Sequence, residues 1–168
     1  MLRVVPDGWF SYDFTVFDRS GTPIAQADLA NWRETAKLKV RGTHYEAHHK
    51  GWRSKEFVLV KEDGRVVTLA GKPSAWKDRL IFEHSGSRYE LRKEPDWRST
   101  FILSRDGVGL VGSIGRKGFF KRKWTVDLPE ELPLEVRVFV VWLAVVLWKR
   151  ADSTTASTVG AAAGVSVF

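Results

Sequence analysis

Residues 134–150 read LEVRVFVVWLAVVLWKR, and this stretch limits the folds that the chain can adopt. From Val138 to Trp148 every one of the 11 residues is apolar. A helix without a polar face has to be buried on all sides. It would span about 16 Å at 1.5 Å per residue, and a bilayer core needs roughly 20 residues. We therefore predict a buried core helix over 134–150, with a strand as the alternative because β-branched residues are frequent.

The flanks of this stretch carry helix end signals. The preceding segment, residues 127–135, is acidic and broken by proline, and Pro133 suits the first turn of a helix. Its glutamates suit the positive end of the helix dipole, and Lys149 and Arg150 suit the negative end. From residue 151 to 168 the chain is rich in Ser, Thr, Ala and Gly, so we predict a flexible tail whose last four residues could form an edge strand.

The chain before residue 127 predicts short strands joined by tight turns. Polar and apolar residues alternate in several stretches, and Ser-Gly or Asp-Gly pairs separate them, as two-residue hairpin turns require. Phe14, Phe57 and Phe101 each precede a turn glycine by six or seven residues, which indicates three similar hairpins rather than a propeller. The predicted strand stretches are 13–17, 36–41, 57–60, 79–82 and 101–103, and the turns lie at 20–21, 63–64, 85–86 and 106–107.

These pieces pose a burial problem that a closed sheet solves. An open sheet would leave half of the apolar helix in water, whereas a barrel surrounds it and removes the sheet edges. A barrel wide enough for a helix needs roughly a dozen strands. The predicted fold class is mainly β with one helix (α+β): a closed antiparallel β-barrel around a central hydrophobic C-terminal helix, in one domain over residues 1–150.

Composition narrows the classes of function. The 168 residues contain no cysteine, which excludes disulfides, thiolate metal sites and a cysteine nucleophile. Lys and Arg number 27 against 20 acidic residues, a net charge of +7. That surplus favours phosphate groups, nucleic acid or an anionic bilayer as partners. The first residues contain no apolar stretch typical of a signal peptide, so we expect a cytoplasmic protein without a transmembrane segment, in contact with the inner face of the membrane.

The order of motifs near the C-terminus resembles that of a known superfamily. Strand hairpins are followed by Gly112-Ser-Ile-Gly115, Trp124, Asp127-Leu-Pro, Leu132-Pro-Leu-Glu-Val and the apolar stretch. This order is similar to that of the tubby C-terminal-like superfamily, which includes the phospholipid scramblases and the LURP-one-related proteins. The resemblance covers about Trp9 to Arg150 and implies a β-barrel that surrounds a hydrophobic C-terminal helix.

The resemblance also bears on ligands. Tubby proteins use a basic pair on a strand to bind phosphoinositide head groups. Scramblases carry an acidic calcium-binding stretch before the last helix, but residues 127–135 lack the Asp-x-Asp oxygens that calcium loops favour. We therefore expect no calcium and no cofactor.

Two basic clusters are the candidate sites for an anionic ligand. Lys37, Lys39 and Arg41 would share one face of a strand, about 6.6 Å apart, although ordinary solvated strands look similar. The second cluster frames Phe119 and Phe120, a mixture suited to a membrane surface or a single-stranded nucleic acid; the alternative is a loop with two packed phenylalanines. Its cations are Arg116, Lys117, Lys121, Arg122 and Lys123.

Most of the eight tryptophans recur near predicted strand ends. In those places they could cap the mouths of the barrel or lie at a lipid interface. Capping is the simpler interpretation. The tryptophans near strand ends are Trp9, Trp32, Trp52, Trp76, Trp97 and Trp124.

Other motifs give no case for an enzyme. Residues 107–112 match G-x-G-x-x-G, but the glycine-rich sequence that follows does not favour the helix that a dinucleotide site needs. His44, Glu46 and His48 would share one strand face and could hold a metal, with His49 on the other face. An exposed polar strand is the simpler interpretation. No nucleophile elbow is present.

We therefore predict a non-enzymatic protein that binds anionic phospholipid or phosphoinositide head groups peripherally through the two basic clusters. Three alternatives stay open: a nucleic-acid-binding module, a protein anchored in a membrane by residues 138–148, and an interaction protein of unknown partner. The sequence does not give the oligomeric state.

Overall fold

The computed structural model describes residues 1–8, 11–30, 33–51, 54–73, 79–95, 99–117 and 123–161. Within these residues the chain forms strands throughout its first three quarters and then one helix. The elements are β1 (Leu2–Pro6), β2 (Phe14–Phe17), β3 (Pro23–Leu29), β4 (Ala36–Val40), β5 (Thr43–His49), β6 (Glu56–Lys61), β7 (Val66–Gly71), β8 (Arg79–His84), β9 (Ser87–Lys93), β10 (Phe101–Arg105), β11 (Gly109–Lys117), β12 (Lys123–Asp127) and α1 (Leu134–Ala161).

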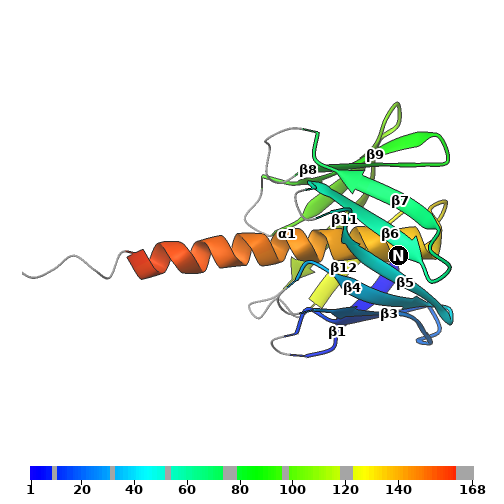
Figure 1. Ribbon diagram of the computed structural model, residues 1–168, viewed down its shortest axis with the longest axis horizontal. Helices are drawn as coiled ribbons and strands as arrows, with labels where there is room; N and C mark the ends of the chain where they lie inside the picture. The colour runs from blue at the N-terminus through cyan, green and yellow to red at the C-terminus, as the bar shows by residue number, and fades with distance from the viewer. Residues whose placement is uncertain are drawn as a thin grey trace, which may run out of the picture.

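The strands form a closed antiparallel barrel, as predicted. Each strand pairs with the next along the chain, and β1 pairs with β12 to complete the ring. Figure 1 shows the barrel wrapped around α1. The inward side chains follow a period of two: Ala36, Leu38 and Val40 of β4 are buried. Closure leaves no free sheet edge and encloses the apolar helix on all sides.

The turns that the sequence predicts are confirmed. Gly64 and Gly107 lie at positive φ angles of 84° and 76°, which a glycine adopts without steric cost. Residues 107–112 thus form the turn between β10 and β11 and the start of β11, not a dinucleotide loop. Gly112 meets a different requirement, because a Cβ atom there would lie 2.6 Å from the carbonyl oxygen of Asp127 on β12.

The core is built on α1. All residues from Val138 to Trp148 are at most 3% exposed, which confirms a helix buried on every side. The three phenylalanines of the similar hairpins are buried as well, and Phe57 packs edge-on against Trp142 with ring centroids 5.5 Å apart. The helix begins at Leu134, where the Pro133 carbonyl accepts the first hydrogen bond from the Arg137 amide at 3.0 Å.

The helix is longer than the sequence indicated. It continues past Arg150 to Ala161, so the predicted end of the helix at Arg150 is too early. No proline interrupts it, and the Ser153 hydroxyl donates to the Lys149 carbonyl at 2.8 Å, which satisfies the hydroxyl within the helix. Figure 1 shows this part extending well beyond the barrel. The possible edge strand at 165–168 lies outside the described residues.

The two ends of the barrel are built differently. The connections after even-numbered strands, together with the segment that leads into α1, form what we call the turn end. The connections after odd-numbered strands form the exit end, where α1 leaves the barrel (Figure 1). The turn end comprises residues 18–22, 41–42, 62–65, 85–86, 106–108 and 128–133, and the exit end comprises 7–13, 30–35, 50–55, 72–78, 94–100 and 118–122.

Candidate functional site

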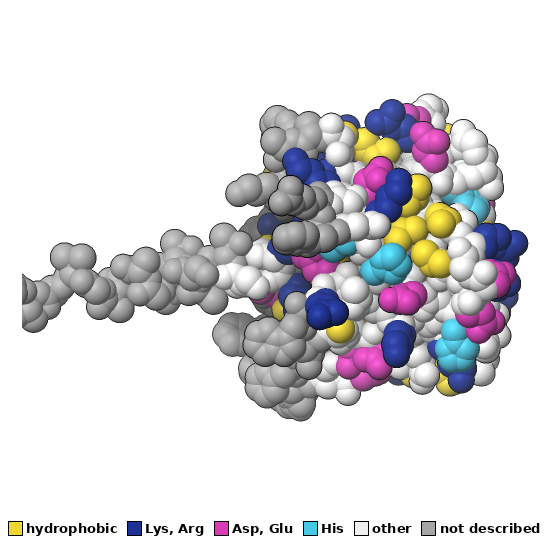
Figure 2. All heavy atoms as spheres, in the orientation of Figure 1, with side chains coloured by type: hydrophobic (Ala, Val, Ile, Leu, Met, Phe, Trp, Pro, Cys, Tyr) yellow, Lys and Arg dark blue, Asp and Glu magenta, His cyan; other side chains and the backbone are white. Residues whose placement is uncertain are grey.

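The predicted cations of β4 share one outer face of the barrel. Lys37 and Lys39 are exposed between inward-facing residues, and Arg41 is exposed in the turn that follows. The strand register places Lys37 between Asp28 of β3 and Glu46 of β5. Opposite charges on neighbouring strands weaken the positive potential there. Figure 2 shows basic and acidic side chains interspersed over this side of the molecule.

Two small hollows adjoin these cations. One has a volume of about 190 Å³, and Gln26, Lys39 and Arg41 are among its lining residues. The other has a volume of about 160 Å³ and lies between Asp28, Lys37 and Glu46. Arg137 on the first turns of α1 belongs to the same end of the barrel as Arg41; burial lowers the pKa of its guanidinium, and the nearby positive charge of Arg41 contributes to that lowering. Both hollows are open to solvent, which suits contact with a charged group at the surface rather than an enclosed ligand.

Arg116 lies in a different place from the other predicted cations. Its side chain is 5% exposed and points into the barrel, where Nη1 donates to Asp152 Oδ2 of α1 at 3.0 Å. The guanidinium also lies over the Trp148 ring, 4.6 Å from its centroid. Arg116 Nη2 also donates to Asp152 Oδ1 at 3.4 Å, and Tyr12 donates a further hydrogen bond to Asp152 at 3.1 Å. Arg116 therefore links α1 to strand β11 of the barrel through an ion pair and is not a surface cation.

The inward position of Arg116 has a signal in the sequence. Gly112 and Ile114 of β11 are buried, and Arg116 continues the same period of two. Burial and the carboxylate of Asp152 together raise the pKa of Tyr12. No pattern in the sequence predicts that Asp152 pairs with Arg116, because Asp152 lies in the segment that composition alone predicts to be flexible.

The remaining cations of the second cluster are only partly described. The backbones of Lys117 and Lys123 are directly opposite each other in the β11–β12 ladder. Lys121 and Arg122 lie outside the described residues, as do the two phenylalanines at 119–120. Their position in the sequence places them in the exit-end connection between β11 and β12.

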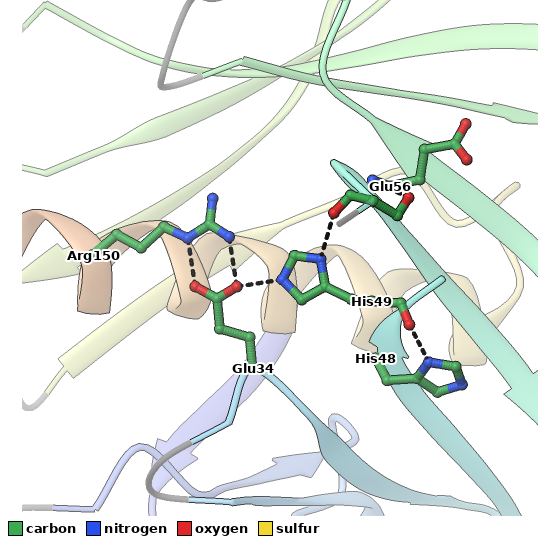
Figure 3. A network of polar contacts seen from close by, with 6 residues as sticks. Glu34, His48, His49, Glu56 and Arg150 are labelled. Carbon is green, nitrogen blue, oxygen red and sulfur yellow. Dashed lines mark hydrogen bonds and ion pairs between the residues drawn. The ribbon is translucent and has the colours of Figure 1, made fainter. Parts of the chain in front are cut away.

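A second fastening of α1 joins Glu34, His49 and Arg150 (Figure 3). Arg150 donates through Nε and Nη2 to the Glu34 carboxylate, and His49 Nε2 contacts the same carboxylate. The other ring nitrogen of His49 faces the Ser54 carbonyl oxygen at 3.2 Å. Burial alone would raise the pKa of Glu34, but the hydrogen bonds from Arg150 and His49 outweigh burial and hold that pKa below its usual value.

The alternating residues of β5 do not form a metal site. In the described part of the chain no group of three or more His, Cys, Asp or Glu side chains is arranged to hold a metal ion. His44 and Glu46 are exposed on the outer face, as the simpler interpretation predicted. His49, on the opposite face, is part of the fastening with Glu34.

The exit end concentrates aromatic and basic residues in its sequence. Each of its six connections contains Trp or Phe, whereas the turn-end connections contain no aromatic residue at all. Lys and Arg outnumber Asp and Glu by nine to six in the exit-end connections, and the ratio is three to six at the turn end. Of the tryptophans near strand ends, Trp124 is 9% exposed and packs in the core; the other five belong to exit-end connections and lie outside the described residues.

Three contacts tie α1 to these connections where it leaves the barrel. Trp148 Nε1 donates to the Ser99 carbonyl at 2.8 Å, Arg150 pairs with Glu34, and Asp152 accepts from Tyr12. Among the described residues no helix is both long and apolar enough to cross a membrane. The connections at the exit end are therefore rich in aromatic and basic residues in the sequence, and contacts of Trp148, Arg150 and Asp152 hold α1 where it leaves the barrel.

Comparison of the chain with protein-family models, with curated proteins and with solved structures finds no match.

Proposed function

We propose that the protein binds anionic phospholipid surfaces peripherally and that the exit end is the surface that meets the lipid. The observation that carries this proposal is the segregation of aromatic and surplus basic residues to the connections at one end of the barrel. Random placement would have distributed tryptophan and phenylalanine over both ends.

The chemistry of these connections fits a bilayer surface. Tryptophan places an apolar ring and a polar N–H at the level of the lipid head groups. Lysine and arginine are attracted to anionic lipids by about 1 kcal/mol each near the surface. In the sequence a cation follows Trp32, Trp52, Trp76 and Trp97 directly, so each of these connections contains both an aromatic and a basic residue.

The resemblance to the tubby C-terminal-like superfamily enters the proposal at this point. The closed barrel around α1 has the architecture that this resemblance implies. We propose membership of that group, and phosphoinositide head groups are then among the anionic lipids to be tested. A location at the inner face of the cytoplasmic membrane belongs to the same proposal.

The β4 cations have a secondary role in this arrangement. Lys37 lies near the exit end of β4, and Arg41 lies in the turn at the other end. Four residues of extended strand separate them by about 13 Å. Docking through the exit end therefore brings Lys37 closest to the lipid and leaves Arg41 farthest from it.

Flotation of the protein with lipid vesicles tests the proposal. Vesicles of phosphatidylcholine alone are compared with vesicles that also contain phosphatidylserine or a phosphoinositide, at low and at physiological salt. We expect flotation with the anionic vesicles only. Absence of flotation, together with tight binding to single-stranded nucleic acid that weakens steeply with salt, would overturn the proposal in favour of a nucleic-acid module.

A charge-matched pair of variants locates the surface. Lys50 and Lys55 are exposed at the exit end, and Arg19 and Arg65 are exposed at the turn end. Replacing either pair by Glu changes the net charge by the same amount. We expect Lys50→Glu with Lys55→Glu to reduce flotation strongly and Arg19→Glu with Arg65→Glu to reduce it much less. Equal loss would mean that total charge, and not the exit end, governs binding.

Alanine at Lys37, Lys39 and Arg41 tests the strand cations separately. We expect a modest reduction that comes mainly from Lys37. Complete loss of flotation would instead make the outer face of β4 the lipid-binding surface.

A further inference from the structure

We infer that the turn end of the barrel carries a binding site for a phosphate group, formed by the guanidinium groups of Arg41 and Arg137 with Lys39 at its edge. The ligand is a soluble one, inorganic phosphate or a phosphate monoester. The site lies at the opposite end of the barrel from the exit end, so it is independent of the proposed lipid surface and goes beyond the proposed function.

The feature that points to this site is Arg137, a partly buried cation. It lies in the first turn of α1, where its amide donates to the Pro133 carbonyl at 3.0 Å, and its neighbours Val136 and Val138 are fully buried. Its Nε atom is buried and has no hydrogen-bond partner among the residues that the structure describes. Buried polar groups are nearly always hydrogen-bonded, and an exception indicates strain, a functional role or a bound ion.

The carboxylates in the segment that leads into α1 are engaged with other cations. Glu130 pairs with Arg19 at 3.2 Å, and Glu131 pairs with Arg105 at 2.9 Å. Within the described ranges of the chain, no carboxylate lies within ion-pair distance of Arg137. The charge of Arg137 is therefore available to an external anion.

Arg41 brings a second guanidinium to the same place. Among the strands, β3 and β4 lie nearest to α1, and the Arg41 amide donates to the Ile24 carbonyl at 2.9 Å, which holds the turn after β4 against β3. Burial lowers the pKa of Arg137; the charges of Glu130 and Glu135 counter that lowering, and the charge of Arg41 adds to it. The two guanidinium groups therefore repel each other, and an anion that contacts both removes the repulsion.

The hollow of about 190 Å³ beside Arg41 provides room for the ligand. Arg41, Lys39 and Gln26 line it, and both cations are exposed to solvent. A planar guanidinium binds phosphate oxygens through two parallel N–H bonds, and a lysine adds a point charge. Two arginines and one lysine at this end of the barrel therefore suit a phosphate group better than a halide ion.

The charge of the surrounding turn end limits the ligand to a small anion. Its connections contain six acidic residues against three basic ones. Such a surface repels an anionic bilayer or a nucleic acid, whose negative charge extends over many contacts. A single phosphate group meets only the local cations, so a soluble phosphate compound is the ligand that fits.

Thermal unfolding in inorganic phosphate tests the site. Melting temperatures of the full chain are measured by circular dichroism over a series of phosphate concentrations and over a sodium chloride series of matched ionic strength and pH. At a phosphate concentration about tenfold above the dissociation constant, we expect a rise of about 3–5 °C over the chloride series. No rise over chloride would overturn the inference.

Variants at the two arginines show whether the phosphate binds there. We expect Arg41→Gln and Arg137→Gln each to raise the dissociation constant for phosphate about tenfold, because each removes charge-assisted hydrogen bonds. Arg65→Gln is the matched control, since Arg65 is exposed at the same end and the change removes the same charge; its effect should stay below about twofold. Because Arg41 is exposed, its variant keeps the test valid if Arg137→Gln unfolds. Equal losses at Arg41 and Arg65 would overturn the inference.

Flotation separates this site from the proposed lipid surface. The double variant of Arg41→Gln with Arg137→Gln should float with phosphoinositide vesicles as the unmodified protein does. Loss of flotation in that variant would mean that the phosphate belongs to a lipid head group, and it would overturn both the soluble ligand and docking through the exit end. Phosphate binding by a protein that floats with no vesicle would overturn the proposed function and support this site.

Discussion

The two partners of the ion pair between Arg116 and Asp152 should differ in how much their removal destabilises the barrel. Arg116 is 5% exposed and Asp152 is 32% exposed, so water can reach the carboxylate but scarcely reaches the guanidinium. Arg116→Met keeps the packing of the side-chain stem and leaves Asp152 to be hydrated. Asp152→Asn leaves a buried positive charge without an ionised partner, which is the costlier change.

The magnitudes follow from these exposures. Removing one partner of a fully buried pair costs about 3–5 kcal/mol. We expect Asp152→Asn to fall at the lower limit, about 3 kcal/mol, because Asn can still accept from Tyr12 and Arg116. Arg116→Met should cost about 1.5 kcal/mol, because the remaining carboxylate is partly solvated and the interaction with the Trp148 ring is lost. The double variant should cost less than the sum, by at least about 1 kcal/mol.

Urea unfolding followed by tryptophan fluorescence measures all three free energies. Arg3→Met is the control, because the exposed Arg3 lies 5.5 Å from the ring of Phe17 without burial, and it should change stability by less than about 0.5 kcal/mol. The reasoning is refuted if Arg116→Met costs more than Asp152→Asn, or if the two single effects add within about 0.5 kcal/mol.

Three further predictions concern stability. The pKa of Glu34 is lowered in the folded protein, so the stability that its ionised carboxylate contributes is present above the ordinary value of 4.5 and is lost as the pH falls through the lowered pKa. The melting temperature of Glu34→Gln should therefore lie below that of the unmodified protein at pH 7, and the gap should close as the pH is lowered through that range. A gap that persists unchanged at low pH would contradict this. Gly112→Ala should destabilise by about 2–3 kcal/mol in urea, because its Cβ would lie 2.6 Å from a backbone oxygen, whereas at Gly115 the nearest atom is a side-chain oxygen at 3.4 Å and the cost should be under about 1 kcal/mol; similar costs at both positions would count against the clash. Trp142→Asp should abolish the cooperative thermal transition followed by circular dichroism, because the site is fully buried, while Val108→Asp at a 63% exposed site should leave the transition intact; a cooperative Trp142→Asp variant would mean that α1 is not the core.

Much of the barrel could be predicted because its determinants are local or compositional. The run from Val138 to Trp148 has no polar face, and only an enclosing structure can bury it. Period-two alternation assigns inward and outward residues, so β4 was placed correctly and even the inward position of Arg116 follows from its phase with Ile114. Glycine turns define the hairpins, and consecutive hairpins fix the strand order. These features each depend on a few neighbouring residues.

The ion pairs that hold α1 and the difference between the two ends of the barrel depend on tertiary structure. Arg116 and Asp152 are 36 positions apart, and Glu34 and Arg150 are 116 apart; no local pattern selects such partners. Composition predicted a flexible segment after Arg150, but packing and these ion pairs carry the helix past that point. The sequence shows an aromatic residue in every second connection. Antiparallel closure brings all of those connections to one end of the barrel, because the chain reverses direction at each strand. The path of α1 makes that end the one where the helix leaves, because the helix starts at the opposite end and crosses the whole core.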